Sequence, residues 1–412
     1  MKENDGKEFK IKKNEKDYLE KRGDFVLFTI LLINFILVFA FLALNMEIIE
    51  KLKEKLFIII GLSLFGSLLV YRLIPPFMEM LHLKKHFGID INKVEDIKNL
   101  SDPNRKEVPE TLGLVSAVTF LVISIVFQTL FISSESQKMK FSSVIMSICF
   151  MAFLGFVDDM LDLRWRYKLV LPTIACIPIV MTYTSDELDE KLIPKFVLKL
   201  LYSLGLNTVI IGFLFKIYLT MLSVFCTNAI NIYAGINGLE VGQTIVITFS
   251  LILYNLIEIK NGSYGNQYIE GHIMSFYVLV MFLFIILPLF YYNKYPSDCF
   301  IGDTFCYFSG ITLACSSIIG NFPIRILLFF IPQILNFLLS IPQLIGIIPC
   351  PRHRLPTFNA KTKLLYSKQD QLNLLNQGLR IIGPTREQDL CNIAMSFQML
   401  CSFFSFVLIY IC

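Results

Sequence analysis

The run SSVIMSICFMAFLGFVDDM (Ser142–Met160) shows the pattern that decides the fold of this 412-residue chain. It has no charged residue before Asp158 and Asp159. An apolar run of about 18 to 25 residues is long enough to cross the hydrocarbon core of a bilayer as an α-helix. The two acids belong to a charged stretch, FVDDMLDLRWRYK (Phe156–Lys168), with three acids and three bases. The run therefore predicts a membrane-spanning helix that ends in a polar cluster.

Runs of this kind recur along the chain, which is 55% hydrophobic and only 17% charged. They cover residues 25–44, 56–79, 112–133, 142–160, 167–184, 206–227, 239–258, 272–292, 300–318, 324–347 and 390–412. A soluble α/β protein would not carry so many. The fold class that we predict is an all-α polytopic membrane protein with about ten core transmembrane helices plus one extra N-terminal helix.

The distribution of Lys and Arg predicts the orientation of these spans. With the amino terminus in the cytosol, cytosolic segments hold 25 of the 37 basic residues and the other side holds 10. We therefore expect a basic cytosolic tail (1–24), an extra transmembrane helix (25–44) and a membrane-embedded domain (56–412) with a cytosolic loop (348–389). The alternative for 25–44 is a cleaved signal peptide, which the charged tail before it and its length disfavour.

Cysteines and glycosylation sequons say little about function. The ten cysteines form no CxxC pair, so neither a disulfide framework nor a zinc site is indicated. The sequon at Asn261 falls in a loop that we place outside the cytosol, and its glycosylation is a hypothesis only.

Five polar clusters lie at the predicted cytosolic ends of the spans, which indicates one site at that face of the membrane. They are the acids and bases of 158–168, NAINIYAGINGLE (228–240), FIGDTF (300–305), PCPRHRLP (349–356), and GIDINK (88–93) followed by Glu110.

The acid pair Asp158 and Asp159 has two interpretations. It could be a solvated pair at the membrane edge, where the carboxyl end of a helix disfavours anions. It could instead belong to a functional site, although adjacent acids on a helix point in different directions and need not share one ligand.

The other clusters leave similar alternatives open. Asn228 and Asn231, spaced i, i+3 on one helix face, could join neighbouring helices or offer oxygen ligands to magnesium. Asp303 could cap the helix that it opens. The segment Arg352–Arg354 could anchor a helix end to lipid phosphate or bind the oxygens of a diphosphate.

Together the clusters supply carboxylates and carboxamides for a divalent metal, and Arg and Lys for phosphates. These are the groups that phosphoryl transfer needs, and the membrane setting suggests a lipid substrate. The rival from another class is a transporter, whose polar residues should line a path through the bilayer midplane. A second rival is a bacterial-type transferase that uses another nucleotide sugar.

Four segments carry a family resemblance: FLGFVDDMLDLRWRYKLVLP, FCTNAINIYAGINGLEVGQ, FIGDTFCYFSG and IIPCPRHRLP. Their sequence, order and spacing resemble the polyprenyl-phosphate sugar-1-phosphate transferases, and within these the eukaryotic dolichyl-phosphate N-acetylglucosamine-phosphotransferases. Bacterial relatives typically have Asp-Gly where this chain has Asn237-Gly238, and a His-rich loop where it has Arg352-His353-Arg354.

The resemblance implies a magnesium-dependent transfer of GlcNAc-1-phosphate from UDP-GlcNAc to dolichyl phosphate, with Mn²⁺ as an alternative metal. The reaction would make dolichyl-diphosphate-GlcNAc and UMP at the cytosolic face of the endoplasmic reticulum membrane, as the first step towards N-glycosylation. The implied partners are these two substrates and membrane lipid, with no nucleic acid. The sequence does not report the oligomeric state, and a homodimer is left open.

The resemblance also implies residue roles. Asn231 and Asp303 would bind the metal, Lys168 the diphosphate or acceptor charge, and Asp158 and Asp159 would belong to the catalytic group. The substrate-binding set for UDP-GlcNAc is Ile89, Asp90, Ile91, Glu110, Trp165, Asn237, Phe300, Arg352, His353 and Arg354. The expected dolichyl-phosphate groove comprises Lys168 with Val224, Phe225, Cys226, Thr227, Asn228, Ala229, Ile230, Asn231 and Ile232.

Three departures from the family pattern stand out. Asp162 occupies a position where the family usually has Asn. The loop after Arg354 is short, and that loop helps to shape the GlcNAc pocket. The span 25–44 has no counterpart.

Overall fold

The computed structural model describes residues 45–90, 107–163, 167–183, 195–262, 266–349 and 354–411, together with separate positions between 29 and 41. The basic tail and most of the extra span 25–44 lie outside the described residues, as do Ile91, Trp165, Arg352 and His353.

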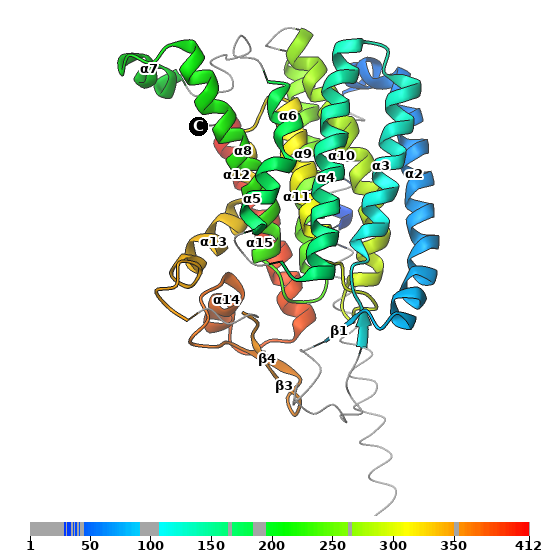
Figure 1. The fold of residues 1–412 in the computed structure, drawn as a ribbon, viewed down its shortest axis with the longest axis vertical. Helices are drawn as coiled ribbons and strands as arrows, with labels where there is room; N and C mark the ends of the chain where they lie inside the picture. Colours follow the sequence, from blue (N-terminus) through cyan, green and yellow to red (C-terminus); the bar gives the residue numbers. More distant parts are fainter. Residues whose placement is uncertain are drawn as a thin grey trace, which may run out of the picture.

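The described chain is a bundle of helices with four very short strands (Figure 1). Within the described residues, seven helices are long and apolar enough to cross a membrane. They are α2 (Met46–Leu83), α3 (Gly113–Phe131), α4 (Glu135–Leu161), α8 (Thr208–Ile232), α9 (Leu239–Asn261), α10 (Asn266–Asn293) and α15 (Glu387–Tyr410). The all-α membrane fold is thereby confirmed. The expected span at 300–318 is the helix α11 (Gly302–Ile319).

Two expected spans are each divided into shorter helices. The described part of the first, residues 167–183, contains α5 (Tyr167–Ala175) and α6 (Ile177–Met181), and residues 324–347 contain α12 (Ile326–Phe329) and α13 (Ile331–Leu344). Both α6 and α13 begin with a proline in the first turn. Pro332 has no N–H to donate to the carbonyl of Leu328 four residues earlier. Ser405 of α15 donates its hydroxyl to that carbonyl at 2.6 Å instead.

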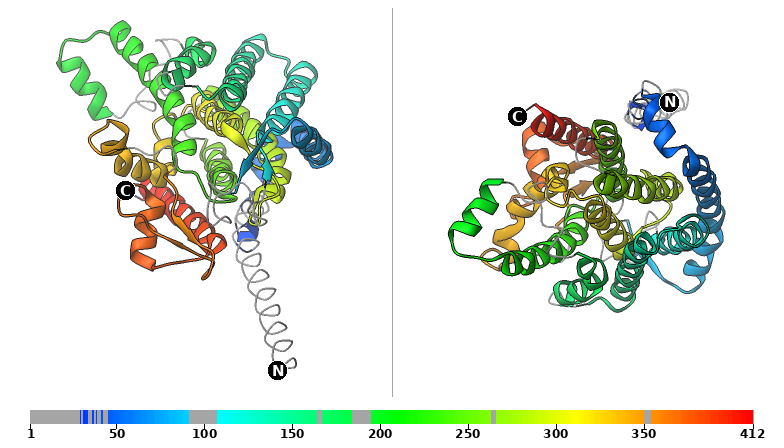
Figure 2. Two further views of the ribbon diagram at one scale, coloured as in Figure 1. Left: turned by 60° about the horizontal axis from the view of Figure 1, so that its bottom comes forward. Right: turned by 90° about the horizontal axis from the view of Figure 1, so that it is seen from above.

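The centre of the bundle is formed by α9, α10 and α11, whose side chains are mostly buried (Figure 2). The surrounding helices carry large apolar side chains on their outer faces, including Phe57, Leu130, Met221 and Phe403, each more than 60% exposed. Apolar side chains on the outside of a bundle suit contact with lipid tails rather than water.

Two glycines allow α4, α8 and α11 to pack closely against one another. A Cβ atom at Gly155 of α4 would lie 2.6 Å from the Thr304 Cα of α11. A Cβ atom at Gly310 of α11 would collide with the backbone of Thr227 in α8. Small residues let membrane helices approach closely. Because both contacts involve α11, they hold α4 and α8 against the same helix.

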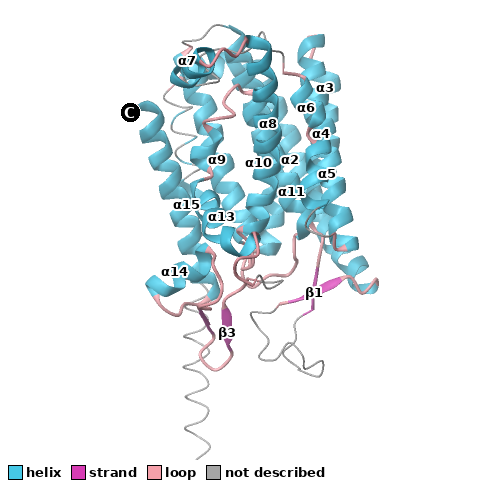
Figure 3. Cartoon of the chain, turned by 60° about the vertical axis from the view of Figure 1, so that its left-hand side comes forward, coloured by secondary structure: helices cyan, strands magenta, loops and turns pink. Residues whose placement is uncertain are grey.

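All four strands lie at one end of the bundle, which we call the site end (Figures 1 and 3). The strands are β1 (Phe87–Ile89), β2 (Glu107–Pro109), β3 (Thr357–Asn359) and β4 (Leu364–Tyr366), paired as antiparallel β1–β2 and β3–β4. Helix α14 (Leu374–Ile382) lies at the same end, and α7 (Lys195–Ser203) lies at the opposite end.

A partly buried polar cluster also lies at the far end, which the sequence did not lead us to expect. The Glu258 carboxylate accepts the Tyr410 hydroxyl at 2.7 Å. Arg325 donates to the hydroxyl of Tyr254 at 2.6 Å, and His272 contacts Asn255 at 2.8 Å. These contacts join α9, α10, α15 and the residue before α12 to one another.

Candidate functional site

Four residues from four helices form a charge cluster at the site end: Asp158 of α4, Lys168 of α5, Asn231 of α8 and Asp303 of α11. The Nζ atom of Lys168 lies 2.8 Å from Asp158 Oδ2 and 2.9 Å from Asp303 Oδ2. The amide of Asn231 donates to Asp303 Oδ1 at 2.8 Å. The structure therefore joins residues that the sequence placed in three separate clusters.

The carboxylate of Asp158 is fixed on both oxygens. Its Oδ1 accepts the backbone N–H of Leu163 at 3.0 Å, and its Oδ2 accepts the hydroxyl of Tyr307 at 3.0 Å. Asp158 is only 3% exposed, and a buried carboxylate is stable only when it is paired and hydrogen-bonded. It is therefore not a solvated acid at the membrane edge.

Asp159 contacts the start of α11. Its Oδ1 accepts the backbone N–H of Asp303 at 2.6 Å, and its Oδ2 accepts the backbone N–H and the hydroxyl of Thr304. The first N–H groups of a helix have no partner within the helix, and a carboxylate is favourable there. The side chain that caps α11 is thus Asp159. The Asp303 side chain does not cap the helix and instead contacts Lys168 and Asn231.

Asp162 has a conformational role. It follows the last residue of α4 with a φ of 50°, in the left-handed region, and its N–H donates to the carbonyl of Asp158. Asn and Asp tolerate this conformation better than other residues with a Cβ atom. The backbone therefore accounts for a short polar residue at this position.

A second group, which we call the hairpin cluster, gathers beside the β1–β2 hairpin. A Cβ atom at Gly88 would collide with the Glu110 carboxylate and lie 3.2 Å from the ring of Phe300. The backbone N–H of Phe300 donates to Pro109 at 2.8 Å, and its carbonyl accepts from Leu112 at 3.1 Å. Glu110 and Phe300 therefore cover the same face of the hairpin, and Ile89 and Asp90 continue from Gly88.

The charge on Glu110 is affected by its surroundings. Burial raises the pKa of Glu110 above its ordinary value of 4.5, and the charge of Asp303 acts in the same direction while His86 opposes both.

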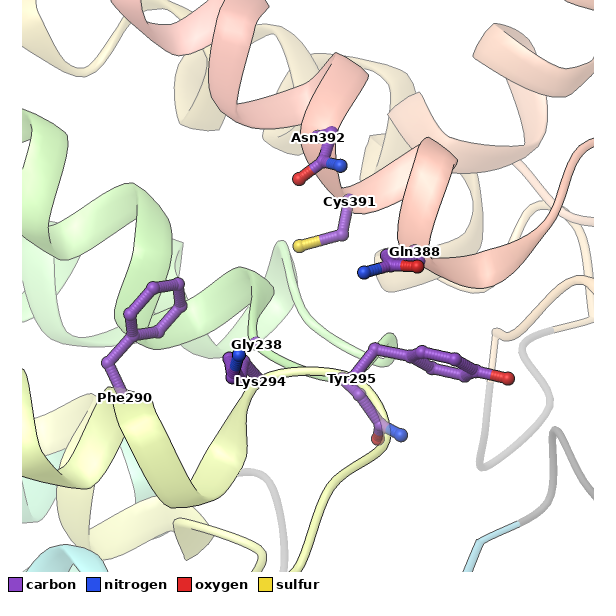
Figure 4. Close-up of a pocket in the computed structure, with 8 residues that line it drawn as sticks. Gly238, Phe290, Lys294, Tyr295, Gln388, Cys391 and Asn392 are labelled. Atoms are coloured by element: carbon purple, nitrogen blue, oxygen red, sulfur yellow. The ribbon is translucent and has the colours of Figure 1, made fainter. Parts of the chain in front are cut away.

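Asn237 completes the hairpin cluster from the loop between α8 and α9. Its amide donates to Asp90 Oδ2 at 3.3 Å, and both residues are buried. Figure 4 shows the neighbourhood of this loop, where Gln388, Cys391 and Asn392 of α15 lie across from Gly238 and Lys294.

The predicted dolichyl-phosphate segment lies in α8, whose helical period places some of its residues inside the bundle and others on a partly exposed face. Cys226, Thr227, Ala229 and Ile230 are buried in the bundle. Val224, Asn228 and Asn231 are partly exposed and, at spacing i, i+4, i+7, share one helix face. Phe225 packs on Phe337 of α13. The amide of Asn228 donates to the carbonyl of Val224 at 2.8 Å, within its own helix.

The loop that carries Arg354 is held by side chains of neighbouring helices. Asn373, at the start of α14, donates to the carbonyl of Arg354 at 2.5 Å. Gln343 of α13 donates to the carbonyls of Pro349 at 3.2 Å and Asp370 at 2.9 Å. These contacts bring the loop towards the site end, while Arg352, His353 and Trp165 lie outside the described residues.

The sequence reasoning missed several residues of the site. Tyr307 lies four positions after Asp303, so helical spacing could have indicated that it shares the face of Asp303. Thr304 follows Asp303 directly. Glu240 ends the polar cluster 228–240, and it accepts the backbone N–H of Gly235 at 3.0 Å. Glu387, which contacts Asn237, carried no signal, because the two residues are 150 positions apart.

The donors of the charge cluster suit a hard cation. Asp303 and Asn231 offer a carboxylate and a carboxamide, and Mg²⁺ is usually bound by one or two carboxylates together with substrate phosphates. Among the described residues no group of three His, Cys, Asp or Glu side chains could hold a metal by itself. The residues therefore fit a metal that shares its coordination with a phosphorylated ligand.

Comparison with known proteins places this arrangement in a family. Residues 141–321 match glycosyl transferase family 4. The UDP-N-acetylglucosamine–dolichyl-phosphate N-acetylglucosaminephosphotransferase of Dictyostelium discoideum is 44% identical over 356 residues, covering 83% of this chain and 86% of the relative. The Saccharomyces cerevisiae protein of the same name is 33% identical, with 73% and 81% covered. A phospho-N-acetylmuramoyl-pentapeptide-transferase of Borrelia garinii is 24% identical, with 64% and 78% covered. The chain therefore belongs to the family of UDP-N-acetylglucosamine–dolichyl-phosphate N-acetylglucosaminephosphotransferases.

Proposed function

We propose that this protein transfers GlcNAc-1-phosphate from UDP-GlcNAc to dolichyl phosphate, which is the first step of lipid-linked oligosaccharide synthesis. A phosphate oxygen of dolichyl phosphate forms a bond to the β-phosphorus of UDP-GlcNAc. The bond between that phosphorus and the bridging oxygen breaks, and UMP leaves with the electron pair. The products are dolichyl-diphosphate-GlcNAc and UMP.

The observation that carries the proposal is the contact of Lys168 with both Asp158 and Asp303, at 2.8 and 2.9 Å. Phosphoryl transfer depends mainly on positioning and on neutralising charge. Asp158, itself fixed by Tyr307 and Leu163, holds the ammonium group of Lys168 in place. From there Lys168 can bind a phosphate oxygen of either substrate.

A divalent cation, for which we propose Mg²⁺, would be held by Asp303 and Asn231. When bound, it would neutralise the diphosphate. Asp159 serves this metal site indirectly, because it fixes the first turn of α11 and so the position of Asp303. A nucleophile that is already a phosphate anion needs no strong general base, which fits an Asp158 carboxylate that is occupied on both oxygens.

The two substrates would approach from different sides. The lipid phosphate would reach Lys168 along the partly exposed face of α8 that carries Val224, Asn228 and Asn231. The uridine would lie against the hairpin cluster, with Phe300 stacking on uracil and Glu110 and Asn237 binding polar groups. We place Arg354, and by the family resemblance Arg352, His353 and Trp165, at the diphosphate and GlcNAc.

We propose the endoplasmic reticulum membrane as the location, with the site end in the cytosol. The excess of Lys and Arg in the segments at this end supports the orientation.

The test is a reaction with defined substrates. Protein purified in detergent is given MgCl₂, dolichyl phosphate and UDP-GlcNAc labelled in the sugar. We expect one UMP for each labelled lipid product, no product without dolichyl phosphate or with EDTA, and inhibition by tunicamycin. Failure of the folded protein to form labelled lipid from these substrates would overturn the proposal.

A further inference from the structure

The loop between α8 and α9 is held at three backbone positions by side chains. Gln243 donates to the carbonyl of Tyr233 at 2.9 Å, and Glu240 accepts the N–H of Gly235 at 3.0 Å. The third contact is the shortest: Glu387 Oε1 accepts the N–H of Asn237 at 2.7 Å. Gln243 and Glu240 lie in the first turns of the helix that follows the loop, whereas Glu387 comes from the C-terminal helix.

The position of Glu387 favours a stable hydrogen bond to Asn237. It is the first residue of α15, where a carboxylate is favourable beside the free N–H groups of the helix. It is only 5% exposed, and Asn237 is only 6% exposed. A hydrogen bond to a carboxylate is stronger than one between neutral groups, and burial excludes the water that would compete for it.

The first turns of α15 pack against the loop between α8 and α9. Gln388, Cys391 and Asn392 project from α15 towards Gly238 and the end of α10 (Figure 4). A displacement of the start of α15 would therefore be passed directly to the backbone of Asn237.

A second carboxylate fixes the direction of the Asn237 side chain. Asp90 Oδ2 lies 3.3 Å from Asn237 Nδ2. Asp90 Oδ2 accepts this hydrogen bond, so the carboxamide turns its NH₂ side towards Asp90. The amide oxygen of Asn237 is thereby left to accept a hydrogen bond from a ligand.

We propose that Glu387 and Asp90 are positioning residues that make Asn237 selective for uracil. Glu387 fixes the backbone of Asn237, and Asp90 fixes its amide. The amide oxygen then accepts the N3–H of uracil, which cytosine lacks at the corresponding nitrogen. This inference rests on the proposed function, because it takes the hairpin cluster as the uridine site.

Equilibrium binding of UMP and CMP to detergent-purified protein tests the proposal without requiring turnover. Glu387→Ala should weaken UMP binding about tenfold, as expected for the loss of a hydrogen bond to a charged group. Glu387→Gln, whose side-chain oxygen can still accept the N–H of Asn237, should stay within about threefold of the unmodified protein. Asp90→Asn should lower the preference for UMP over CMP about tenfold, because its own amide no longer forces one orientation of Asn237.

Glu258→Ala is the matched control. Glu258 is also a buried glutamate, 6% exposed, that accepts a hydrogen bond from another helix, but it lies at the far end of α9. Its removal should lower the melting temperature and leave UMP affinity unchanged. In the transfer assay, Glu387→Ala should raise the KM for UDP-GlcNAc about tenfold, with kcat and the KM for dolichyl phosphate within about twofold.

Three results would overturn the inference: unchanged UMP affinity in folded Glu387→Ala, a loss in Glu387→Gln as large as in the alanine variant, or an equal loss in Glu258→Ala. If Glu387→Ala does not fold, an unchanged UMP/CMP ratio in folded Asp90→Asn would also contradict it. A protein that binds UMP but makes no lipid product would contradict the proposed function and leave this inference standing.

Discussion

The carboxylate of Asp159 accepts the backbone N–H of Asp303 at 2.6 Å, so an acid at the end of α4 caps the start of α11. This contact explains why two adjacent acids occur at the end of an apolar helix. Asp158 faces Lys168, whereas Asp159 sets the position of the helix that carries Asp303.

Replacing Asp159 should therefore damage both stability and activity. Asp159→Ala leaves two N–H groups of α11 without a partner, which should lower the free energy of unfolding by about 1–2 kcal/mol. Activity should fall at least tenfold because Asp303 is no longer held. Thermal unfolding and the transfer assay measure the two effects.

Two comparisons make this result specific. Asp159→Asn can still accept one N–H and should retain more activity than the alanine variant. Glu135→Ala, at the other end of α4 with a side chain 87% exposed, should behave like the unmodified protein. Full activity in Asp159→Ala would contradict the role assigned to the cap.

Replacing Lys168 by Met should abolish transfer and also destabilise the protein. The substitution leaves the buried Asp158 without its cation, which should lower the free energy of unfolding by about 1–3 kcal/mol. The loss should be smaller than for a fully buried ion pair, because the Lys168 side chain is 27% exposed. The double variant Lys168→Met/Asp158→Asn should regain most of the lost stability and none of the activity. Recovery of activity in the double variant would show that Lys168 is not needed for the chemistry.

The raised pKa of Glu110 predicts how stability depends on pH. Because burial raises this pKa above 4.5, the folded state binds more protons than the unfolded state between 4.5 and the raised value. The contribution of Glu110 to the free energy of unfolding therefore falls as pH rises through that window. Above the raised pKa the buried, ionised carboxylate destabilises the folded state most.

Glu110→Gln removes that cost. Its melting temperature should exceed that of the unmodified protein at pH 8, and the difference should shrink as the pH falls towards 4.5. His86 also acts on Glu110, so His86→Gln is measured alongside. A melting difference that grows on acidification would have the wrong sign for a raised pKa.

The helix contact at Gly310 should not tolerate a methyl group. A Cβ atom there meets the backbone of Thr227, and backbone cannot move as a side chain can. Gly310→Ala should lower both the melting temperature and activity, because α8 carries Asn231. Gly61→Ala is the control, since nothing lies within 4 Å of its Cβ position and alanine favours helix by about 1 kcal/mol. Equal melting temperatures for the two variants would argue against close packing of α8 on α11.

The sequence predicted the fold class, and it predicted that several polar side chains lie together at one end of the bundle, because both depend on local patterns. Apolar runs of membrane length gave the helices, and their polar ends indicated that Asp158, Asn231 and Asp303 would meet. The division at Pro332 was harder to foresee, since a proline in a membrane helix is tolerated wherever a neighbour satisfies the freed carbonyl. Here that neighbour is Ser405, which is remote in sequence.

The sequence does not predict in which direction individual side chains point. Asp158 and Asp159 look equivalent in the sequence, and only the rotation of α4 against α11 separates their roles. The link from Glu387 to Asn237 depends on where α15 packs, which no local pattern encodes. Residue types and spacing thus predicted which polar groups lie at the site end, and tertiary packing decides which contacts each of them makes.

The most direct test of the account compares the unmodified protein with Asp303→Ala in the transfer assay, with thermal unfolding measured on both. We predict that the unmodified protein forms labelled dolichyl-diphosphate-GlcNAc and UMP in equal amounts. We predict that Asp303→Ala melts at a similar temperature and forms neither. Normal product formation by Asp303→Ala would contradict the claim that the charge cluster is the catalytic centre.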